Sequence, residues 1–188
     1  MDNRSNLLAC ALRLFADRGY DAVGIQEIVD AAEVTKPTLY HYFGNKYGLL
    51  EALLQAHFAP LNQLLRQAAD YHHDLPLTLT NICKTFFQYA RENPTFYRLQ
   101  LGLWFAPENS EAHQAVARWN DEQYQIVEQV FLQAVSDHGN MRGRHSAYAA
   151  TLIGMIHTYI GLSLNHRVEL TDQLVTQAVH QFQHGIYS

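Results

Sequence analysis

The sequence predicts an all-α protein of about nine helices, and three observations lead to this fold class. Apolar residues recur at intervals of three and four along the whole chain, which is the spacing of one helix face. No segment shows the alternation of apolar and polar residues that is typical of a half-buried strand. Glycines and prolines divide the helical pattern into separate segments, and no repeat or low-complexity run interrupts it.

The composition is that of a folded globule. Of 188 residues, 48% are apolar and 16% are charged, which excludes a disordered chain. The two cysteines, Cys10 and Cys83, lie among apolar residues and form no CxxC pair, so we expect buried free thiols. No basic leader with an apolar run and no uncharged apolar stretch of about 18 residues is evident. We therefore expect a cytoplasmic protein with no membrane partner.

The first fifty residues are typical of three short helices and the start of a fourth. An apolar stripe predicts the first helix over residues 4–18, and Gly19 ends it. The second helix begins near Gly24. The third begins at Thr35, an N-cap residue, with Pro37 in its first turn. Its apolar side consists of Leu39, Tyr42 and Phe43.

The remaining chain continues the helical pattern to its end. Asn93–Pro94, Pro107 and Gly139 separate successive segments. We expect helices from Asn45 through Leu54 and beyond, and over residues 77–91, 95–105, 110–138, 144–166 and 171 to the end. The segment 144–166 is apolar on nearly all sides and is predicted to be central. We place a helix-turn-helix head at residues 1–48 and a ligand-binding and dimerisation body at residues 49–188.

Two short helices joined by a tight turn, at residues 26–32 and 36–43, match the plan of a helix-turn-helix. The second helix of this motif enters the major groove of double-stranded DNA with its N-terminal end leading. The hydroxyl of Thr35 and the free amides of the helix N-terminus suit a phosphate. Lys36, Pro37 and Thr38 would face base edges, since an amine suits guanine acceptors and apolar surface suits the thymine methyl group.

Three segments of the head carry a family resemblance. Residues 15–20 (FADRGY), 25–28 (IQEI) and 34–46 (VTKPTLYHYFGNK) resemble the head of TetR/AcrR-family transcriptional regulators, and the likeness covers roughly residues 4–55. The resemblance implies that Leu39 and Phe43 are core residues. It implies DNA contacts by Gln26, Thr35, Lys36, Pro37, Thr38, Tyr40, His41 and Lys46, with Lys46 clamping the backbone on the flank.

What this resemblance implies is a ligand-responsive DNA-binding regulator without a cofactor. It would be a repressor that binds a palindromic operator as a homodimer and leaves it when a small apolar or aromatic effector binds. Three residues depart from the family pattern. Gly24 replaces a Ser or Thr cap, Glu33 occupies a turn position usually held by glycine, and Gly48 replaces a capping glutamate. A left-handed Glu33 would carry strain of about 1 kcal/mol.

The charge of the chain gives little support to the hypothesis that it binds DNA. The chain has a net charge of −5, and its first fifty residues carry five basic and six acidic side chains. Only the segment 36–46 is locally basic, with two lysines, His41 and no acid. An alternative is therefore a ligand- or partner-binding module of the same fold that has lost DNA binding.

A dimer face is predicted on segment 144–166, where small residues form one narrow stripe that would let another backbone approach closely. The stripe consists of Ala147, Ala150, Gly154, Thr158 and Gly161. The last helix would add Val175, Ala178, Val179 and Phe182, giving a four-helix bundle from two subunits. The alternative is that the same stripe packs within one chain.

An effector pocket is inferred mainly from the resemblance. The middle of the chain is rich in aromatic residues, and one stripe of segment 110–138 has a single polar member, Gln123. A buried amide needs a hydrogen-bond partner, and a ligand is one candidate. We predict that Trp104, Trp119, Gln123 and His157 line the pocket. The alternative is that these residues belong to an ordinary core.

Neither a metal centre nor an enzyme is predicted. His72–His73 and the pair His180 and His184 have spacings that could hold a metal ion, but no acidic or cysteine partner completes either pair. The sequence contains no HExxH, no GxSxG, no glycine-rich phosphate loop after a strand and no cysteine with an evident base.

Overall fold

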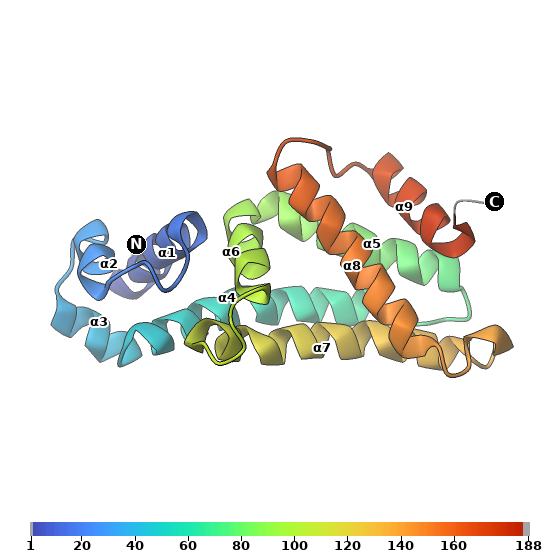
Figure 1. Cartoon of the computed structure of the whole chain (residues 1–188), viewed down its shortest axis with the longest axis horizontal. Helices are drawn as coiled ribbons and strands as arrows, with labels where there is room; N and C mark the ends of the chain where they lie inside the picture. Colours follow the sequence, from blue (N-terminus) through green and yellow to red (C-terminus); the bar gives the residue numbers. More distant parts are fainter. Residues whose placement is uncertain (1, 186–188) are drawn as a thin grey trace. The chain divides into compact units, whose positions relative to one another are not determined.

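The computed structural model describes residues 2–185 and confirms the all-α prediction. Over this range the chain forms nine α-helices and one short 3-10 helix, with no strand (Figure 1). The helices are α1 (Asn3–Arg18), α2 (Ile25–Ala31), α3 (Lys36–Phe43), α4 (Lys46–Ala68), α5 (Leu75–Glu92), α6 (Pro94–Trp104), α7 (Glu111–Ala134), α8 (His145–Leu164) and α9 (Asp172–His184). The 3-10 helix, Gly139–Met141, lies between α7 and α8.

The chain divides into two compact units. Unit 1 contains residues 1–59 and 95–119, and unit 2 contains residues 60–94 and 120–188. The predicted head lies wholly in unit 1, which also contains α6 and the beginning of α7. The compact unit is thus larger than a three-helix head alone.

Helices α1, α2 and α3 lie together in unit 1 and share a small apolar core (Figure 1). Periodicity explains which residues enter it, because each helix contributes only its apolar stripe. The fully or nearly fully buried members are Leu7, Ala11, Phe15, Ile28, Val29 and Leu39. Cys10 is also buried and free, as is Cys83 in unit 2, which confirms the expectation for both thiols.

At the junction between α3 and α4, the backbone of the first turn of α4 lies very close to the end of α3. Gly44 ends α3 at φ 74°, and the Asn45 side chain accepts a hydrogen bond of 2.7 Å from the Gly48 amide. A Cβ atom on Gly48 would overlap the carbonyl oxygen of Phe43. Gly48 is therefore required by the geometry of the junction, which accounts for the missing glutamate at this position.

A group of hydrogen bonds in unit 1 surrounds Tyr20, which follows α1 and is only 3% exposed. The Tyr20 hydroxyl donates a 2.6 Å hydrogen bond to the Glu111 carboxylate at the start of α7. The Lys46 amine, at the start of α4, donates to the carbonyls of Tyr20 at 2.9 Å and Val23 at 3.0 Å. It also lies 4.1 Å from the centroid of the Tyr20 ring. We call Tyr20, Lys46 and Glu111 the Tyr20 cluster.

Aromatic rings form a further part of the unit 1 core. Phe58 stacks on Trp119, with centroids 5.3 Å apart, and meets Phe96 edge-on at 5.1 Å. The His57 ring stacks on the Phe96 ring, with centroids 4.5 Å apart. Burial lowers the pKa of His57. These contacts join α4, α6 and α7 within the unit.

In unit 2, α9 and α8 both pack against α5. Apolar residues dominate this core, including Ile82 and Phe86 of α5 and Ile156 of α8. A polar chain links α4 to α7 in the same unit. The Gln123 amide donates to the Asn62 side-chain oxygen at 3.1 Å, and the Asn62 amide donates to the Glu122 carboxylate at 2.7 Å.

Among the described helices, α8 is long and apolar enough to cross a membrane, judged by length and composition alone. Of its most apolar window, 33% is buried. The core helix of a globular protein meets the same two criteria, and α8 packs on α5, although most of this window is not buried.

Replacing Gly48 with alanine tests the α3–α4 junction. We expect Gly48→Ala to lower the free energy of unfolding by about 2 kcal/mol or more, because the new methyl group meets backbone that cannot move aside. Gly102→Ala in α6 is the control. Its Cβ would have no atom within 4 Å, so alanine should stabilise the helix by up to about 1 kcal/mol. Chemical denaturation measures both, and a Gly48→Ala variant as stable as the parent chain would contradict the assignment.

Candidate nucleic-acid interface

The exposed surface of α3 is the candidate interface. Leu39 is 0% exposed and fixes the inner side of the helix, whereas Tyr40 is 46% exposed. Lys36, Pro37 and His41 are also exposed. The structure therefore brings these four predicted contact residues to the surface of one short helix. Thr35 and Thr38 lie beside them at its N-terminal end, exposed and half-buried respectively.

Thr35 differs from the expectation in one detail. It occupies the N-cap position with an extended backbone, but its side chain makes no hydrogen bond to the helix amides. Its hydroxyl instead pairs with the Thr38 hydroxyl at 2.9 Å. The backbone carbonyl of Thr35 accepts from the amides of Thr38 and Leu39 at 3.0 and 3.3 Å. The helix end thus retains its partial positive charge, and two hydroxyl groups stand beside it.

Two other predicted contact residues already have partners within the head. Gln26 is exposed on α2 and donates a 2.7 Å hydrogen bond to the Asp30 carboxylate. Lys46 is half-buried, and two of the three donors on its amine are used by backbone carbonyls of the Tyr20 cluster and Val23. DNA contact by either residue stays a prediction.

The aromatic end of α3 corrects the expected burial of two residues. Tyr42, predicted on the apolar side, is 41% exposed, and Phe43 is only half-buried. The physical reason is the set of neighbours: α3 packs on α1 and α2, and Leu39 is the residue that this contact buries, so the side of α3 that carries Tyr42 stays outside it. The Arg4 guanidinium covers Phe43 at 5.5 Å from the ring centroid.

Glu33 adopts the left-handed conformation expected for the turn, at φ 53°. It is exposed, and so are Asp30 and Lys36 on either side of the turn. Glu27 is tied to α1 by an ion pair with Arg18. The Gly24 amide and then Arg18 lower the pKa of Glu27, and the same glutamate supplies the cap that Gly24 lacks.

The four residues predicted to line an effector pocket fall in both units. In unit 1, Trp104 is exposed at the end of α6, while Trp119 is buried against Phe58. Trp119 carries an indole N–H with no hydrogen-bond acceptor among residues 2–185. The Arg118 guanidinium lies 4.9 Å from the Trp119 ring centroid.

In unit 2, Gln123 and His157 are both buried. The side chain of Asn62 provides a protein partner for Gln123, which sequence periodicity does not reveal. His157 meets Phe86 edge-on at 5.7 Å, and burial lowers the pKa of His157 to about 4. It is thus a neutral imidazole at physiological pH. The lining of a pocket by these four residues stays a prediction.

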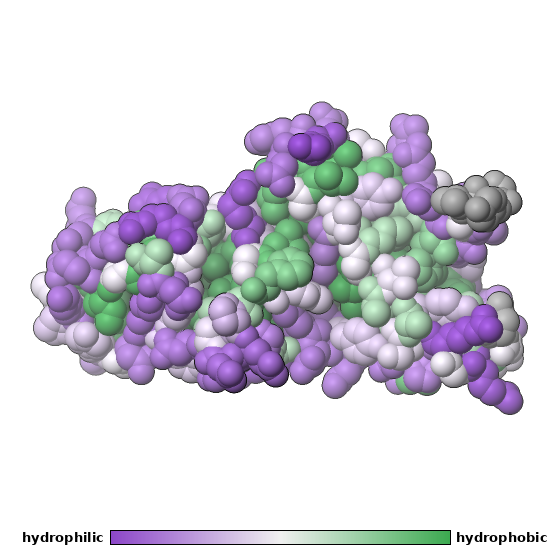
Figure 2. Space-filling view, in the orientation of Figure 1, coloured by the Kyte–Doolittle hydropathy of each residue, from purple (hydrophilic) through white to green (hydrophobic). Residues whose placement is uncertain are grey.

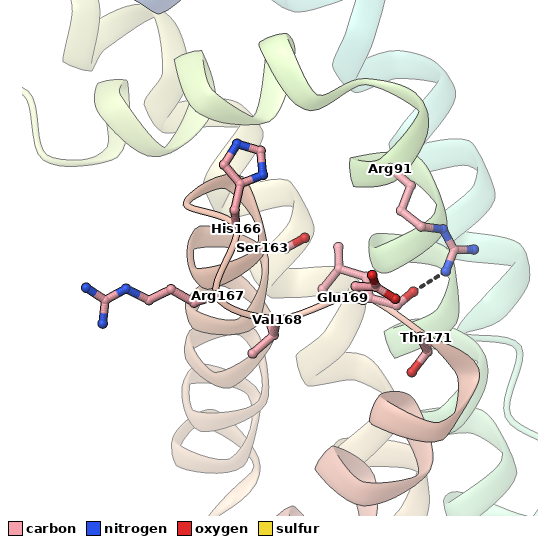
Figure 3. A pocket seen from close by; sticks show the side chains of 8 residues that line it. Arg91, Ser163, His166, Arg167, Val168, Glu169 and Thr171 are labelled. Carbon is pink, nitrogen blue, oxygen red and sulfur yellow. Dashed lines mark hydrogen bonds between the residues drawn. The ribbon is translucent and has the colours of Figure 1, made fainter.

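A hollow of about 620 Å³ lies in unit 2 between the end of α5 and the loop that joins α8 to α9 (Figure 3). The Arg91 guanidinium donates to the Leu170 carbonyl and anchors this loop. Figure 3 shows Arg167 extending away from Arg91 and Glu169, so the charged groups do not converge on one point. None of the four predicted pocket residues borders this hollow.

The predicted dimer stripe is open on α8. Ala147, Ala150, Gly154 and Thr158 are exposed, and Gly161 is half-buried. Figure 2 shows pale and green atoms of small and apolar residues over this helix. A Cβ atom on Gly154 would have no neighbour within 4 Å. The alternative that the stripe packs within the chain does not apply inside unit 2.

The residues predicted for the same face on α9 lie differently. Val175, Ala178 and Val179 are buried within unit 2, and only Phe182 is half-buried. The physical reason is that α9 packs its apolar stripe against α5 of the same chain. On the other side of α9, Thr176 and Gln177 are exposed.

No group of three or more His, Cys, Asp or Glu residues with the geometry of a metal site is found among the described residues. His180 and His184 lie side by side, with ring centroids 4.6 Å apart, and within the described part of the chain no third ligand joins them. His73 pairs with Asp137 at 2.9 Å, while His72 lies near Asp70.

Comparison with known proteins agrees with this geometry. Residues 7–53 match the model of the family described as bacterial regulatory proteins, tetR family. The transcriptional activator FasR of Mycolicibacterium smegmatis is 39% identical over 98 residues, covering 52% of this chain and 45% of FasR. The transcriptional repressor NemR of Escherichia coli is 38% identical over 66 residues, covering 35% and 33%. The matches thus span less than half the length of these relatives, which are regulators rather than enzymes.

Solved structures extend the likeness of fold over nearly the whole chain. A putative fatty acid metabolism regulator of Clostridium perfringens has a TM-score of 0.83 at 20% identity, covering 97% of this chain and 99% of that one. The regulator FadR of Bacillus subtilis, solved in complex with stearoyl-CoA, has a TM-score of 0.79 at 17% identity with the same coverage.

The burial of His157 predicts a specific loss of stability in acid. In the unfolded chain this histidine takes up a proton below about pH 6.5, whereas in the folded chain its pKa is about 4. Between these values the unfolded state binds more protons, so the free energy of unfolding falls as the pH falls, by about 3 kcal/mol in total.

His157→Leu should remove this part of the pH dependence, whatever it does to stability at neutral pH. Denaturant titrations between pH 7 and 4, the interval that contains the unfolded and folded pKa values of His157, measure the slope. The control is His72→Leu in an exposed loop, which should keep the parent slope. Equal slopes for His157→Leu and the parent would refute the burial argument.

Proposed function

We propose that this chain, a member of the TetR family by its N-terminal domain, is a cytoplasmic repressor that binds a palindromic operator as a homodimer. A small apolar or aromatic effector releases it from the operator. The observation that carries the DNA-binding part is the exposed side of α3, where Lys36 stands at the helix N-terminus and Tyr40 and His41 lie one turn later. Helix α3 is then the recognition helix of a helix-turn-helix.

The exposed side of α3 is suited to recognise bases in the major groove through short-range contacts. Lys36 and Pro37 stand in the first turn of α3, where a helix in the major groove approaches base edges. Tyr40 and His41, one turn later, can donate to phosphate oxygens and fix the depth of insertion. The near-neutral charge of the head implies few phosphate neutralisations and hence a weak dependence of affinity on salt.

A homodimer is supported by the open stripe on α8. A helix whose surface is lined by alanine, glycine and threonine allows a second backbone to approach closely and bury apolar area on both sides. A twofold dimer presents two recognition helices, which suits a palindrome with half-sites about one DNA turn apart. Relatives include an activator and a repressor, so the sign of regulation is the part that a reporter assay must decide.

The effector proposal is supported by apolar and aromatic residues in both units. The buried indole N–H of Trp119 lacks an acceptor among residues 2–185, and a ligand oxygen would satisfy it. One structural neighbour was solved with stearoyl-CoA, which makes long-chain acyl-CoA a reasonable first probe. Binding would favour a dimer whose recognition helices no longer match successive major grooves.

The DNA-binding proposal is tested with the DNA upstream of the gene that encodes this chain. The parent protein should shift this DNA in a gel assay, and Tyr40→Ala should weaken the shift by roughly tenfold, about the value of one charge-assisted hydrogen bond. Because Tyr40 is exposed, the melting temperature should hardly change. Leu64→Ala, at an exposed apolar residue of α4 in unit 2, is the control and should keep the parent affinity. If Tyr40→Ala binds this DNA as tightly as the parent protein does, the DNA-binding proposal is wrong.

The dimer proposal is tested by sedimentation. The parent chain should sediment as a dimer at micromolar concentration, and Gly154→Leu should shift it toward the monomer because the bulky side chain fills the space a partner needs. Ala56→Leu places the same side chain on an exposed position of α4 and should remain dimeric. A dimer that tolerates leucine at position 154 would place the interface elsewhere.

A further inference from the structure

We infer that the Tyr20 cluster positions the recognition helix, and that Lys46 serves this internal role rather than clamping a DNA phosphate. The inference rests on the proposed function, because it concerns how α3 is presented to DNA. It names Tyr20 and Glu111 as positioning residues that the sequence pattern does not single out.

The contacts of Lys46 carry the first step. Its amine donates to two backbone carbonyls of the turn between α1 and α2, at 2.9 and 3.0 Å, and faces the Tyr20 ring at 4.1 Å. If the Lys46 amine moved to a DNA phosphate, the two carbonyl oxygens would lose their hydrogen-bond donor and the Tyr20 ring would lose its cation. Two of the three donors on the Lys46 amine are thus satisfied within the head, which favours the internal position of this side chain.

Glu111 carries the second step. Its carboxylate accepts the Tyr20 hydroxyl proton at 2.6 Å, a charge-assisted hydrogen bond between residues 91 positions apart. Tyr20 is thus held by a cation over its ring and by an anion at its hydroxyl. Burial, followed by Glu111, raises the pKa of Tyr20 well above its ordinary value, so the hydroxyl remains a donor at physiological pH.

Chain connectivity links this cluster to α3. Lys46 follows the end of α3 by only three residues, across the close approach of Gly48 to the Phe43 carbonyl. Anchoring Lys46 on the turn before α2 therefore fixes where α3 ends relative to α1 and α2. Glu111 in turn fixes the same turn to the first residue of α7.

A hollow of about 410 Å³ lies beside the cluster, between the end of α1 and the α6–α7 segment. The apolar residues that border it, such as Phe15, Leu99 and Leu103, are at most 3% exposed. Apolar packing therefore holds this side of the head together, and the Tyr20–Glu111 hydrogen bond adds a directional contact beside it.

The role of Lys46 is tested by the salt dependence of operator binding. A lysine that neutralises a phosphate contributes about 0.9 to the slope of log affinity against log salt for B-DNA. We expect Lys46→Gln to weaken binding several-fold and lower the melting temperature while leaving this slope at its parent value. Lys84→Gln, at an exposed position in unit 2, controls for the change in net charge. A slope reduced by about one unit in Lys46→Gln alone would return Lys46 to the DNA contacts and overturn this part of the inference.

The positioning role of Tyr20 and Glu111 is tested by a double-mutant cycle. Tyr20→Phe keeps the buried ring under Lys46 and removes only the hydroxyl, and Glu111→Ala removes the acceptor. Each should raise the operator Kd by about threefold to tenfold, and the double variant should be no worse than either single one. Glu111→Gln keeps an accepting oxygen and should retain most of the affinity. Glu108→Ala, an exposed acid in the same α6–α7 turn, is the matched charge control.

Hydrogen exchange of the α3 amides provides a readout that needs no DNA. Tyr20→Phe and Glu111→Ala should each speed hydrogen exchange in α3 to the same extent. The double variant should exchange no faster than either single variant. If the parent chain binds no operator, the proposed function fails while exchange still decides the inference. If the parent binds operator but the variants leave both Kd and α3 exchange unchanged, or their effects simply add, the positioning role is wrong and the regulator remains.

Discussion

The presentation of α3 depends on one constraint, the backbone approach between the end of this helix and the first turn of α4. Gly48 lies so close to the Phe43 carbonyl that no side chain fits between them, and Asn45 caps α4 in the same turn. The sharp junction turns Leu39 into the core and leaves Lys36 and Tyr40 outside. The proposed groove reading depends on this orientation, because eight residues are too few to hold a helix in place by themselves.

The electrostatics of the head follow from where its few cations are used. Arg18 pairs with Glu27 at the start of α2, and Lys46 serves the Tyr20 cluster, so both charges stabilise the head internally. Lys36 remains exposed on the N-terminal end of α3, close to the partial positive charge of the helix. A head with near-zero net charge can therefore still offer a local cationic edge. In the proposed complex with DNA, affinity would come from hydrogen bonds and fit more than from counterion release.

Sequence periodicity predicted the helices well, because burial of one apolar stripe per helix is a local rule, and the motif at residues 34–46 predicted the exposed side of α3. It did not predict partners distant in sequence. Tyr20 and Glu111 are 91 positions apart, and Gln123 finds Asn62 at a separation of 61. Such pairs depend on how helices pack, so a polar residue in an apolar stripe suggested a ligand when the chain itself supplied the partner. Tyr42 was misplaced for the same reason, since its environment depends on neighbouring helices.

The contrast between α8 and α9 shows how an apolar pattern divides between core and interface. On α9 the stripe is narrow, and burying Val175, Ala178 and Val179 against α5 leaves a polar outer side. Helix α8 is apolar nearly all round, so packing its inner side on α5 still leaves small apolar residues such as Ala150 and Gly154 in contact with solvent. Among residues 2–185, no further element of unit 2 covers them. In the proposed dimer, a second copy of the same helix would remove that surface from water, since two stripes of small residues can approach each other closely.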